Sequence, residues 1–227
     1  MLDIGITDHW HATFPGAHLG VLLVGNVDNS GSTVLDGRKR ELEARLRAQF
    51  SGLSRAELRE LAVLKAYHSY YRKFDQTYHV QLQLESVVHK GKPLPNVSPL
   101  VDVSFLAELD TLVLTAGHDA DRLTWPLTFD VTRGGEAFTQ MNGAVRSLRD
   151  GDMLMRDAQD IVCTVLYGQD QRTPISPETR RALYVAYVPQ GIGGGRVRQH
   201  LELLSDHVRL FAPEIVVELL DVYAARS

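Results

Sequence analysis

The chain has 227 residues, a length that favours one large domain over two, and its 44% hydrophobic and 23% charged content is typical of a globular protein. The net charge of −4 argues against a protein that coats DNA or RNA non-specifically, because that mode needs an excess of Lys and Arg to displace counterions from phosphates. A local basic patch could still bind RNA, whereas we expect no DNA partner.

The sequence also predicts where the protein resides. No apolar stretch approaches the roughly 18 residues of a membrane-spanning helix, and the first residues lack the basic and long apolar regions of a signal peptide. We therefore expect a cytoplasmic protein without a membrane partner. The single cysteine, Cys163, excludes a disulfide framework within the chain, and its apolar neighbours predict a buried, inert thiol.

The first elements in chain order are a strand and two helices. Residues 18–25 form a short apolar run closed by a turn-rich segment, which predicts a buried strand. Residues 38–50 place apolar side chains at spacings of four among charges, the pattern of an amphipathic helix. Ser54 and Glu57 form a capping-box pattern, in which the two side chains satisfy backbone N–H groups at a helix start. We expect this second helix to run to about Phe74.

The middle of the chain alternates between helix and strand signals. Residues 79–90 place apolar side chains on one side of a helix, and Gly91 is a plausible helix stop. After a proline-punctuated segment, residues 100–109 predict a short buried helix. Residues 112–116 are rich in strand-forming side chains, and residues 117–119 read as the turn that ends this strand.

Further strands are predicted at residues 127–131, 161–166 and 182–188. Hairpin-like, glycine-rich sequence lies between the first two. We expect a single helical turn at Ser176, a helix over residues 196–211 and a last helix that begins at Pro213. Together these signals predict an α/β fold of the α+β type, with a mixed β-sheet and interleaved helices, in one domain over residues 1–227.

The sequence contains no motif that is specific for metal, nucleotide or nucleophile chemistry. His9 and His11 are the two histidines closest together in the sequence. Alternate residues of a strand point to opposite faces, and no motif indicates a third ligand. We therefore expect no metal site. No Gly-x-Ser-x-Gly elbow of a hydrolase is present. The glycine-rich residues 191–195 lack the Lys-Ser/Thr ending of a phosphate-binding loop, which favours a flexible loop and no cofactor.

Aromatic and cationic side chains gather near the end of the second predicted helix. Tyr67, Tyr70 and Phe74 are at helical spacing, which is typical of a packing stripe. Arg72 and Lys73 lie beside them and are candidate RNA contacts, because cations next to aromatic side chains form surfaces that bind phosphates and stack bases.

Four short motifs follow one another between residues 71 and 123. They are Tyr71-Arg72-Lys73-Phe74, Lys90-Gly91-Lys92-Pro93-Leu94-Pro95, Pro99-Leu100-Val101-Asp102-Val103-Ser104 and Gly117-His118-Asp119-Ala120-Asp121-Arg122-Leu123. In this order they resemble the tRNA-binding and editing domain of the phenylalanyl-tRNA synthetase β subunit, and more closely its free-standing, single-domain branch. The similarity continues at Phe14-Pro15-Gly16 and at residues 151–157 and 172–179, so it covers nearly the whole chain.

The resemblance implies an editing-domain fold with a pocket for the mischarged 3′ end of a tRNA, where a positioned water cleaves the aminoacyl ester. The chain would then be a trans-acting aminoacyl-tRNA hydrolase and not itself a synthetase. His118 is the candidate general base. The other candidate pocket residues are polar side chains in or near the motifs: Asn96, Asp102, Ser104, Asp119, Asp170, Thr173 and Tyr184. The candidate RNA contacts are the cations Arg72, Lys73, Lys90 and Lys92.

Each pocket candidate also has a structural interpretation. Asp102 and Asp119 are residue types that cap helices and brace turns, and Ser104 can hydrogen-bond to its own helix. Neither interpretation involves a ligand.

The chain departs from the family pattern at its editing residues. Ala116 stands where the family has a His, Phe105 replaces an Asn, and the strand around Val185 lacks the editing Glu, which leaves the Tyr184 hydroxyl for substrate recognition. The sequence therefore leaves a second function open: a non-catalytic module that keeps the fold and binds RNA, a free amino acid or a protein.

Overall fold

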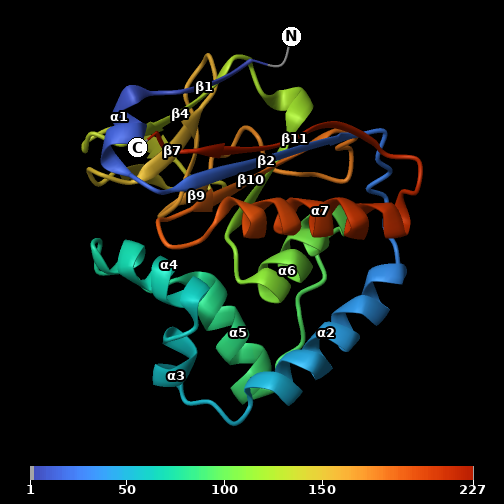
Figure 1. The fold of residues 1–227 in the computed structure, drawn as a ribbon. Coiled ribbons are helices and arrows are strands. Elements are labelled where there is room, and N and C mark those ends of the chain that lie inside the picture. Colours follow the sequence, from blue (N-terminus) through green and yellow to red (C-terminus); the bar gives the residue numbers. More distant parts are fainter. Residues whose placement is uncertain (1–2, 227) are drawn as a thin grey trace.

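The computed structural model describes residues 3–226, which form two β-sheets, a small β-ribbon and a set of helices (Figure 1). The helices are α1 (Asp8–Thr13), α2 (Val34–Phe50), α3 (Arg55–Arg59), α4 (Ala62–Arg72), α5 (His79–Lys90), α6 (Pro99–Thr111) and α7 (Gly194–Phe211), with one 3-10 turn, η1 (Ala120–Arg122). The strands are β1 (Ile4–Ile6), β2 (His18–Gly25), β3 (Thr115–Asp119), β4 (Leu127–Val131), β5 (Ala137–Thr139), β6 (Val145–Ser147), β7 (Met153–Arg156), β8 (Ile161–Thr164), β9 (Gly168–Gln169), β10 (Ala182–Val188) and β11 (Val216–Ala224).

The first sheet has four antiparallel strands in the order β11-β2-β10-β3. Its strand β10 is buried at all seven positions, and it pairs with β2 from Ala182↔Val24 to Val188↔His18. A strand without exposed residues needs cover on both faces. Helices α6 and α7 cover one face of this sheet, and the second sheet lies against the other (Figure 1).

The second sheet has the order β1-β4-β7-β8-β9 and is mixed, because β1 runs parallel to β4 and the other pairs are antiparallel. It meets the first sheet through contacts such as that of Phe129 on β4 with Tyr187 on β10, whose ring centroids are 6.1 Å apart. The interleaved helices and the mixed sheet confirm the predicted fold class.

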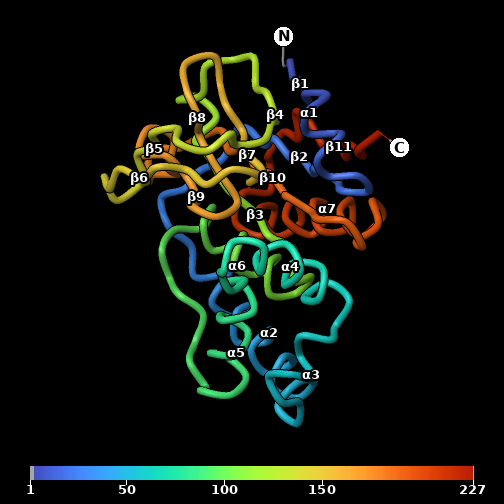
Figure 2. Tube along the Cα trace, turned by 90° about the vertical axis from the view of Figure 1, so that its left-hand side faces the viewer, coloured from blue at the N-terminus to red at the C-terminus, as the bar shows by residue number. Residues whose placement is uncertain are grey.

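Helices α2 to α5 extend away from the sheets on the side of α6 (Figures 1 and 2). The packing stripe predicted on α4 is confirmed, since Tyr67, Tyr70 and Phe74 are all buried. The Tyr67 ring stacks on Tyr78 at a centroid distance of 4.1 Å. Over residues 3–226, none of the helices has both the length and the apolar character that crossing a bilayer requires.

Several local predictions are confirmed to the residue. Strand β2 spans the predicted residues 18–25, and α5 ends at Gly91, which adopts the left-handed conformation with a φ of 64°. The capping box at the start of α3 is formed, because Ser54 accepts from the Glu57 backbone and the Glu57 carboxylate accepts from Ser54. Cys163 is buried, and burial raises the pKa of its thiol to about 12.

Other predictions are wrong. The helix expected from Ser54 to Phe74 is interrupted at Glu60 and Leu61, which separates α3 from α4. The strand expected at residues 112–116 begins three residues later, because Leu112 takes a left-handed conformation (φ 63°) that ends α6. Consequently residues 117–119 belong to β3 and are not a turn.

Three more expectations fail beyond these. A hydrogen-bonded turn, not a helical turn, follows Ser176. His9 and His11 lie on the short helix α1 and not on a strand. The helix expected after Pro213 is the strand β11, which pairs with β2 along its length. A β-bulge between Val217 and Leu219 disturbs the alternation of apolar side chains, which is why the segment resembles a helix in sequence.

Gly20 of β2 supports the contact between the first sheet and α7. A Cβ atom at this position would stand 2.6 Å from Val197 Cγ1. We expect Gly20→Ala to lower the free energy of unfolding by about 1–3 kcal/mol, the usual cost of overpacking a core. Gly52→Ala is the matched control, because its Cβ would meet no atom within 4 Å. Urea denaturation compares the two variants, and equal stabilities would contradict close packing at Gly20.

Candidate functional site

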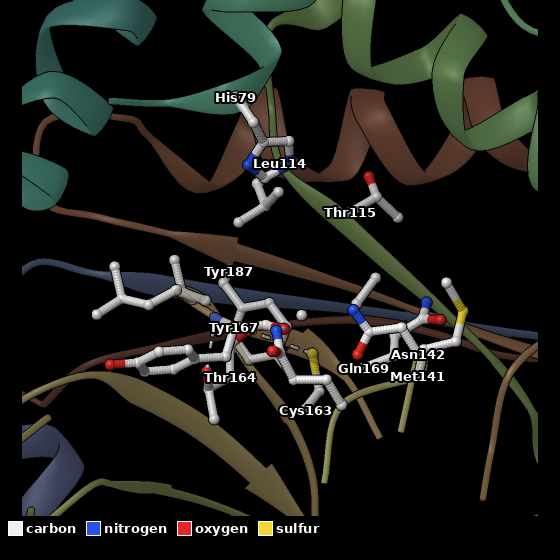
Figure 3. Close-up of a pocket in the computed structure, with 15 residues that line it drawn as sticks. His79, Leu114, Thr115, Met141, Asn142, Cys163, Thr164, Tyr167, Gln169 and Tyr187 are labelled. Carbon is white, nitrogen blue, oxygen red and sulfur yellow. Dashed lines mark hydrogen bonds between the residues drawn. The ribbon is translucent and has the colours of Figure 1, made fainter. Parts of the chain in front are cut away.

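A pocket of about 400 Å³ opens between the two sheets, at the start of β3. Its lining comes from five parts of the chain: His79; Leu114, Thr115 and Ala116; Gln140, Met141 and Asn142; Cys163, Thr164, Val165, Leu166, Tyr167, Gly168 and Gln169; and Tyr187. Figure 3 shows these side chains gathering from elements that are far apart in the sequence. We call this hollow the main pocket.

The neighbouring strands β3 and β10 contribute side chains to the lining of the main pocket. Ala116 of β3 stands opposite Val185 of β10, two positions before Tyr187 on the same strand. These are the two positions at which the synthetase family has editing residues according to the sequence resemblance. The structure therefore places the two departures side by side, and Ala116 lines the main pocket.

Neutral polar groups supply the remaining lining. Gln140 Nε2 donates to the Tyr167 carbonyl at 2.9 Å, and Gln169 donates to the carbonyl of Gly117. Each amide therefore keeps polar atoms for a ligand. No Asp or Glu occurs among the lining residues of the main pocket.

His79 is the one imidazole in this lining, and it sits at the N-terminal end of α5. Its residue is exposed overall, and its Nδ1 lies 3.4 Å from the Tyr71 hydroxyl. Protein atoms around the ring desolvate it and lower its pKa from the ordinary 6.5. His79 is thus predominantly neutral at pH 7 and can accept a proton.

Two buried carboxyl groups, those of Asp152 and Glu108, bond to backbone N–H groups of residues that line the main pocket. Asp152 Oδ1 accepts from the Tyr70 hydroxyl at 2.5 Å and Oδ2 accepts from the Leu166 backbone at 2.9 Å, and burial raises the pKa of Asp152 to about 6. Glu108 of α6 accepts from the Thr115 backbone at 2.8 Å, and burial raises its pKa to about 8. Glu108 is therefore protonated at neutral pH.

His118 belongs to a buried chain of hydrogen bonds outside the main pocket. The Thr173 hydroxyl donates to Asp170 Oδ1 at 2.6 Å, and Thr173 Oγ1 in turn accepts from His118 Nδ1 at 2.8 Å. Asp170 is also paired with Arg172, whose Nε lies 2.8 Å from Oδ2. The His118 ring is fully buried, which lowers its pKa to about 4 and keeps it neutral. His118, Asp170 and Thr173, all predicted to line a pocket, thus lie together, and none of them lines the main pocket.

Two more candidate residues, Asp119 and Tyr184, have structural partners. Asp119 caps η1 through the Asp121 backbone and accepts from the Thr179 hydroxyl at 2.7 Å. The Tyr184 hydroxyl donates to the Leu100 carbonyl at 2.7 Å and is fully buried. Ser104 lies half-buried on α6. All three are outside the lining of the main pocket.

Asn96 and Asp102 lie together at a different place, near the start of α6. The buried Lys39 ammonium donates to Asp102 Oδ2 at 2.6 Å, to the Pro95 carbonyl at 2.8 Å and to Asn96 Oδ1. Asp102 Oδ1 also accepts from the Val97 backbone at 2.9 Å. The buried ion pair ties α2 to α6, and the bonds to Pro95 and Asn96 tie it to the segment before α6.

The four predicted RNA-contacting cations do not form one rim. Arg72 and Lys73 are exposed at the C-terminal end of α4, whereas Lys90 and Lys92 are exposed at the C-terminal end of α5. His79 marks the pocket at the other end of α5, about 18 Å away for a helix of this length. Lys90 and Lys92 are therefore remote from the main pocket.

Sequence reasoning missed most of the lining, including His79, Gln140, Asn142, Cys163 and Gln169. Cys163 was expected to be buried in a strand, and it is, but with its thiol facing the pocket. The amides belong to no motif, because only the pairing of distant hairpins brings them together. Over residues 3–226, no three His, Cys, Asp or Glu side chains converge as metal ligands would.

The buried pair of Lys39 and Asp102 predicts a large stability effect. We expect Asp102→Ala to lower the free energy of unfolding by about 3–5 kcal/mol, because the Lys39 ammonium would stay buried without its counter-charge. The double variant Lys39→Met/Asp102→Leu should recover most of this loss. Chemical denaturation of both variants measures the effect. A single variant as stable as the wild type would contradict the ion-pair role.

Glu108 predicts a pH-dependent stability. Between its ordinary pKa of 4.5 and the raised value of about 8, the unfolded chain releases a proton that the folded chain keeps. The free energy of unfolding should therefore fall as the pH rises through this window, by about 1.4 kcal/mol per unit at most. Glu108→Gln should flatten that slope. Urea titrations from pH 5 to 8.5 measure it, and parallel slopes in both proteins would refute the assignment.

Comparison with known proteins identifies the family. The B3/4 domain matches residues 62–221, well over half of the chain. No curated protein matches the sequence. Among solved structures, an N-terminal fragment of the phenylalanyl-tRNA synthetase β subunit from Pyrococcus horikoshii is similar, with a TM-score of 0.48 and 9% identity over 92% of this chain and 49% of that chain. The chain thus spans about half the length of that fragment. It belongs to the B3/4 domain family.

Proposed function

We propose that this B3/4 domain binds the aminoacylated 3′ end of a tRNA, with the aminoacyl group in the main pocket. The observation that carries the proposal is the pocket lining, which combines apolar side chains with neutral amides and contains no carboxylate. A carboxylate-free wall avoids repulsion of the nucleic-acid backbone beside it. Membership of the B3/4 domain family, together with the motif resemblance to the tRNA-binding and editing domain of the synthetase β subunit, also supports a tRNA ligand.

The amide groups suit an aminoacyl ester. Side-chain N–H groups of Gln140, Asn142 and Gln169 can donate to an ester carbonyl, and their oxygens can accept from the α-amino group. The apolar surface of Ala116, Val165 and Leu166 can receive the amino-acid side chain. Such a pocket recognises the ligand by shape and hydrogen bonding, not by an ion pair.

The reaction that we propose for the bound ester is hydrolysis in trans. A water attacks the ester carbonyl, the bond between the carbonyl carbon and the ribose oxygen breaks, and a free amino acid and a 3′-hydroxyl result. His79 is the proposed proton acceptor for this water, since its imidazole is in the pocket lining and is neutral near pH 7. His118 is less suited, because its ring is fully buried outside the pocket.

A second function is favoured by a specific observation. Ala116 and Val185 face one another where the resemblance implies a His and a Glu, and neither side chain can hold or transfer a proton. The domain in that case binds the aminoacyl end, or a free amino acid, without turnover. Both functions use the main pocket, and they differ in whether the ester is cleaved.

Incubation with a panel of radiolabelled aminoacyl-tRNAs, beginning with tyrosine on the phenylalanine tRNA, distinguishes the two functions. We expect hydrolysis above the buffer rate, and a roughly 100-fold lower rate for His79→Gln, the lower end of general-base contributions. His89→Gln is the matched control, because His89 is exposed at the far end of α5 and outside the pocket.

Filter binding on the same panel completes the test. Preference for aminoacylated over uncharged tRNA without hydrolysis would establish the binding function instead. Neither hydrolysis nor such a preference for any member of the panel would overturn the proposed function.

A further inference from the structure

A second hollow, of about 540 Å³, adjoins the main pocket and shares three lining residues with it. The shared residues are Gln140, Leu166 and Tyr167, and the others are Gln76, Val145, Arg146, Ser147 and Arg149. We call it the arginine hollow. The three shared residues place the arginine hollow directly beside the main pocket, within reach of a ligand that extends out of it.

The guanidinium groups in the arginine hollow are held by neutral acceptors. Arg146 Nε donates to Gln140 Oε1 at 2.9 Å, and Gln140 in turn donates to the Tyr167 carbonyl. Arg149 donates through Nη1 to the Phe74 carbonyl. A guanidinium has five N–H donors, so each arginine is oriented by one bond and keeps further donors for a ligand.

The charge of these arginines is not neutralised by the protein. Over residues 3–226, no carboxylate lies within 4.0 Å of Arg146 or Arg149, whereas Arg181 pairs with both Asp121 and Glu218. The lining contains no Asp or Glu, although Asp75 and Asp150 adjoin it in the chain. The hollow therefore has a local positive charge in a protein whose net charge is −4.

The β5–β6 hairpin, which carries Arg146, packs on buried apolar side chains. Arg146 lies on β6 opposite Phe138 of β5, and this hairpin packs through a small buried cluster of Phe138, Leu148, Leu154 and Ile161. Tyr167, which both hollows share, packs against the same cluster. Figure 2 shows β5, β6 and β9 together on one flank of the molecule.

We propose that the arginine hollow is a phosphate subsite, which binds a phosphate of the nucleotide whose other end occupies the main pocket. Planar guanidinium groups match phosphate oxygens through paired hydrogen bonds, and two of them beside a neutral pocket fit a ligand that is anionic at one end only. The phosphate is a diester of an RNA chain or a monoester of a free nucleotide. This inference rests on the proposed function and assigns the contacts that position its ligand.

Calorimetric titration with three probes tests the subsite: adenosine, 5′-AMP and the trinucleotide CpCpA. We expect the trinucleotide to bind more tightly than adenosine, and Arg146→Ala and Arg149→Ala each to weaken it about 10-fold or more. The slope of log K against log salt should decrease in magnitude by about 0.7 for each arginine removed. Arg198→Ala, an exposed arginine on α7 outside both hollows, should bind like the wild type. Circular dichroism and urea midpoints confirm that each variant is folded.

Each outcome of the titrations supports or overturns the phosphate subsite. Trinucleotide binding that is unchanged in both arginine variants, or equal affinities for adenosine, 5′-AMP and CpCpA, would overturn the subsite. Arginine-dependent binding of 5′-AMP without binding of CpCpA would support a phosphate subsite for a free nucleotide and overturn the tRNA function. Arginine-dependent CpCpA binding together with a failed hydrolysis panel would keep the subsite and leave the binding function.

Discussion

The antiparallel pairing of β10 with β2 and β3 is the constraint on which the rest of the structure depends. Because every residue of β10 is buried, alternate side chains must serve two different layers. Tyr184 points toward the helices and reaches the Leu100 carbonyl, while Val185 and Tyr187 face the second sheet. The same register sets Ala116 opposite Val185, so the position of the main pocket follows from the strand pairing.

Predictions from the sequence succeed where the determinants are local. The capping box at Ser54, the glycine stop at Gly91 and the uninterrupted apolar run of β2 each depend on a few neighbouring residues. They fail where a distant partner decides the conformation. The segment after Pro213 has the spacing of an amphipathic helix, yet it becomes β11 because the edge of β2 offers it a full ladder of backbone hydrogen bonds.

In the candidate site, too, the sequence predicts local features better than contacts between distant segments. Polar residues in the recognised motifs were expected to meet a ligand, and the structure gives most of them partners within the protein: Asp102 pairs with Lys39, Asp119 caps η1, and His118 is linked through Thr173 to Asp170. The amides and His79 of the main pocket could not be predicted from spacing, because the hairpins that carry them approach β3 only in the folded chain. Polar residues of a family motif can thus stabilise the fold without lining the pocket.

The strand order of the first sheet also has a consequence for biosynthesis. Strand β2 is synthesised well before its two neighbours in the sheet, β10 and β11, which begin at residues 182 and 216. Until those residues are synthesised, its apolar run has no hydrogen-bonding neighbour within this sheet, and contacts of such long sequence separation form slowly. An unpaired apolar strand is prone to associate with other chains. The closing of the first sheet around β2 is thus expected to be a late step in the folding of this domain.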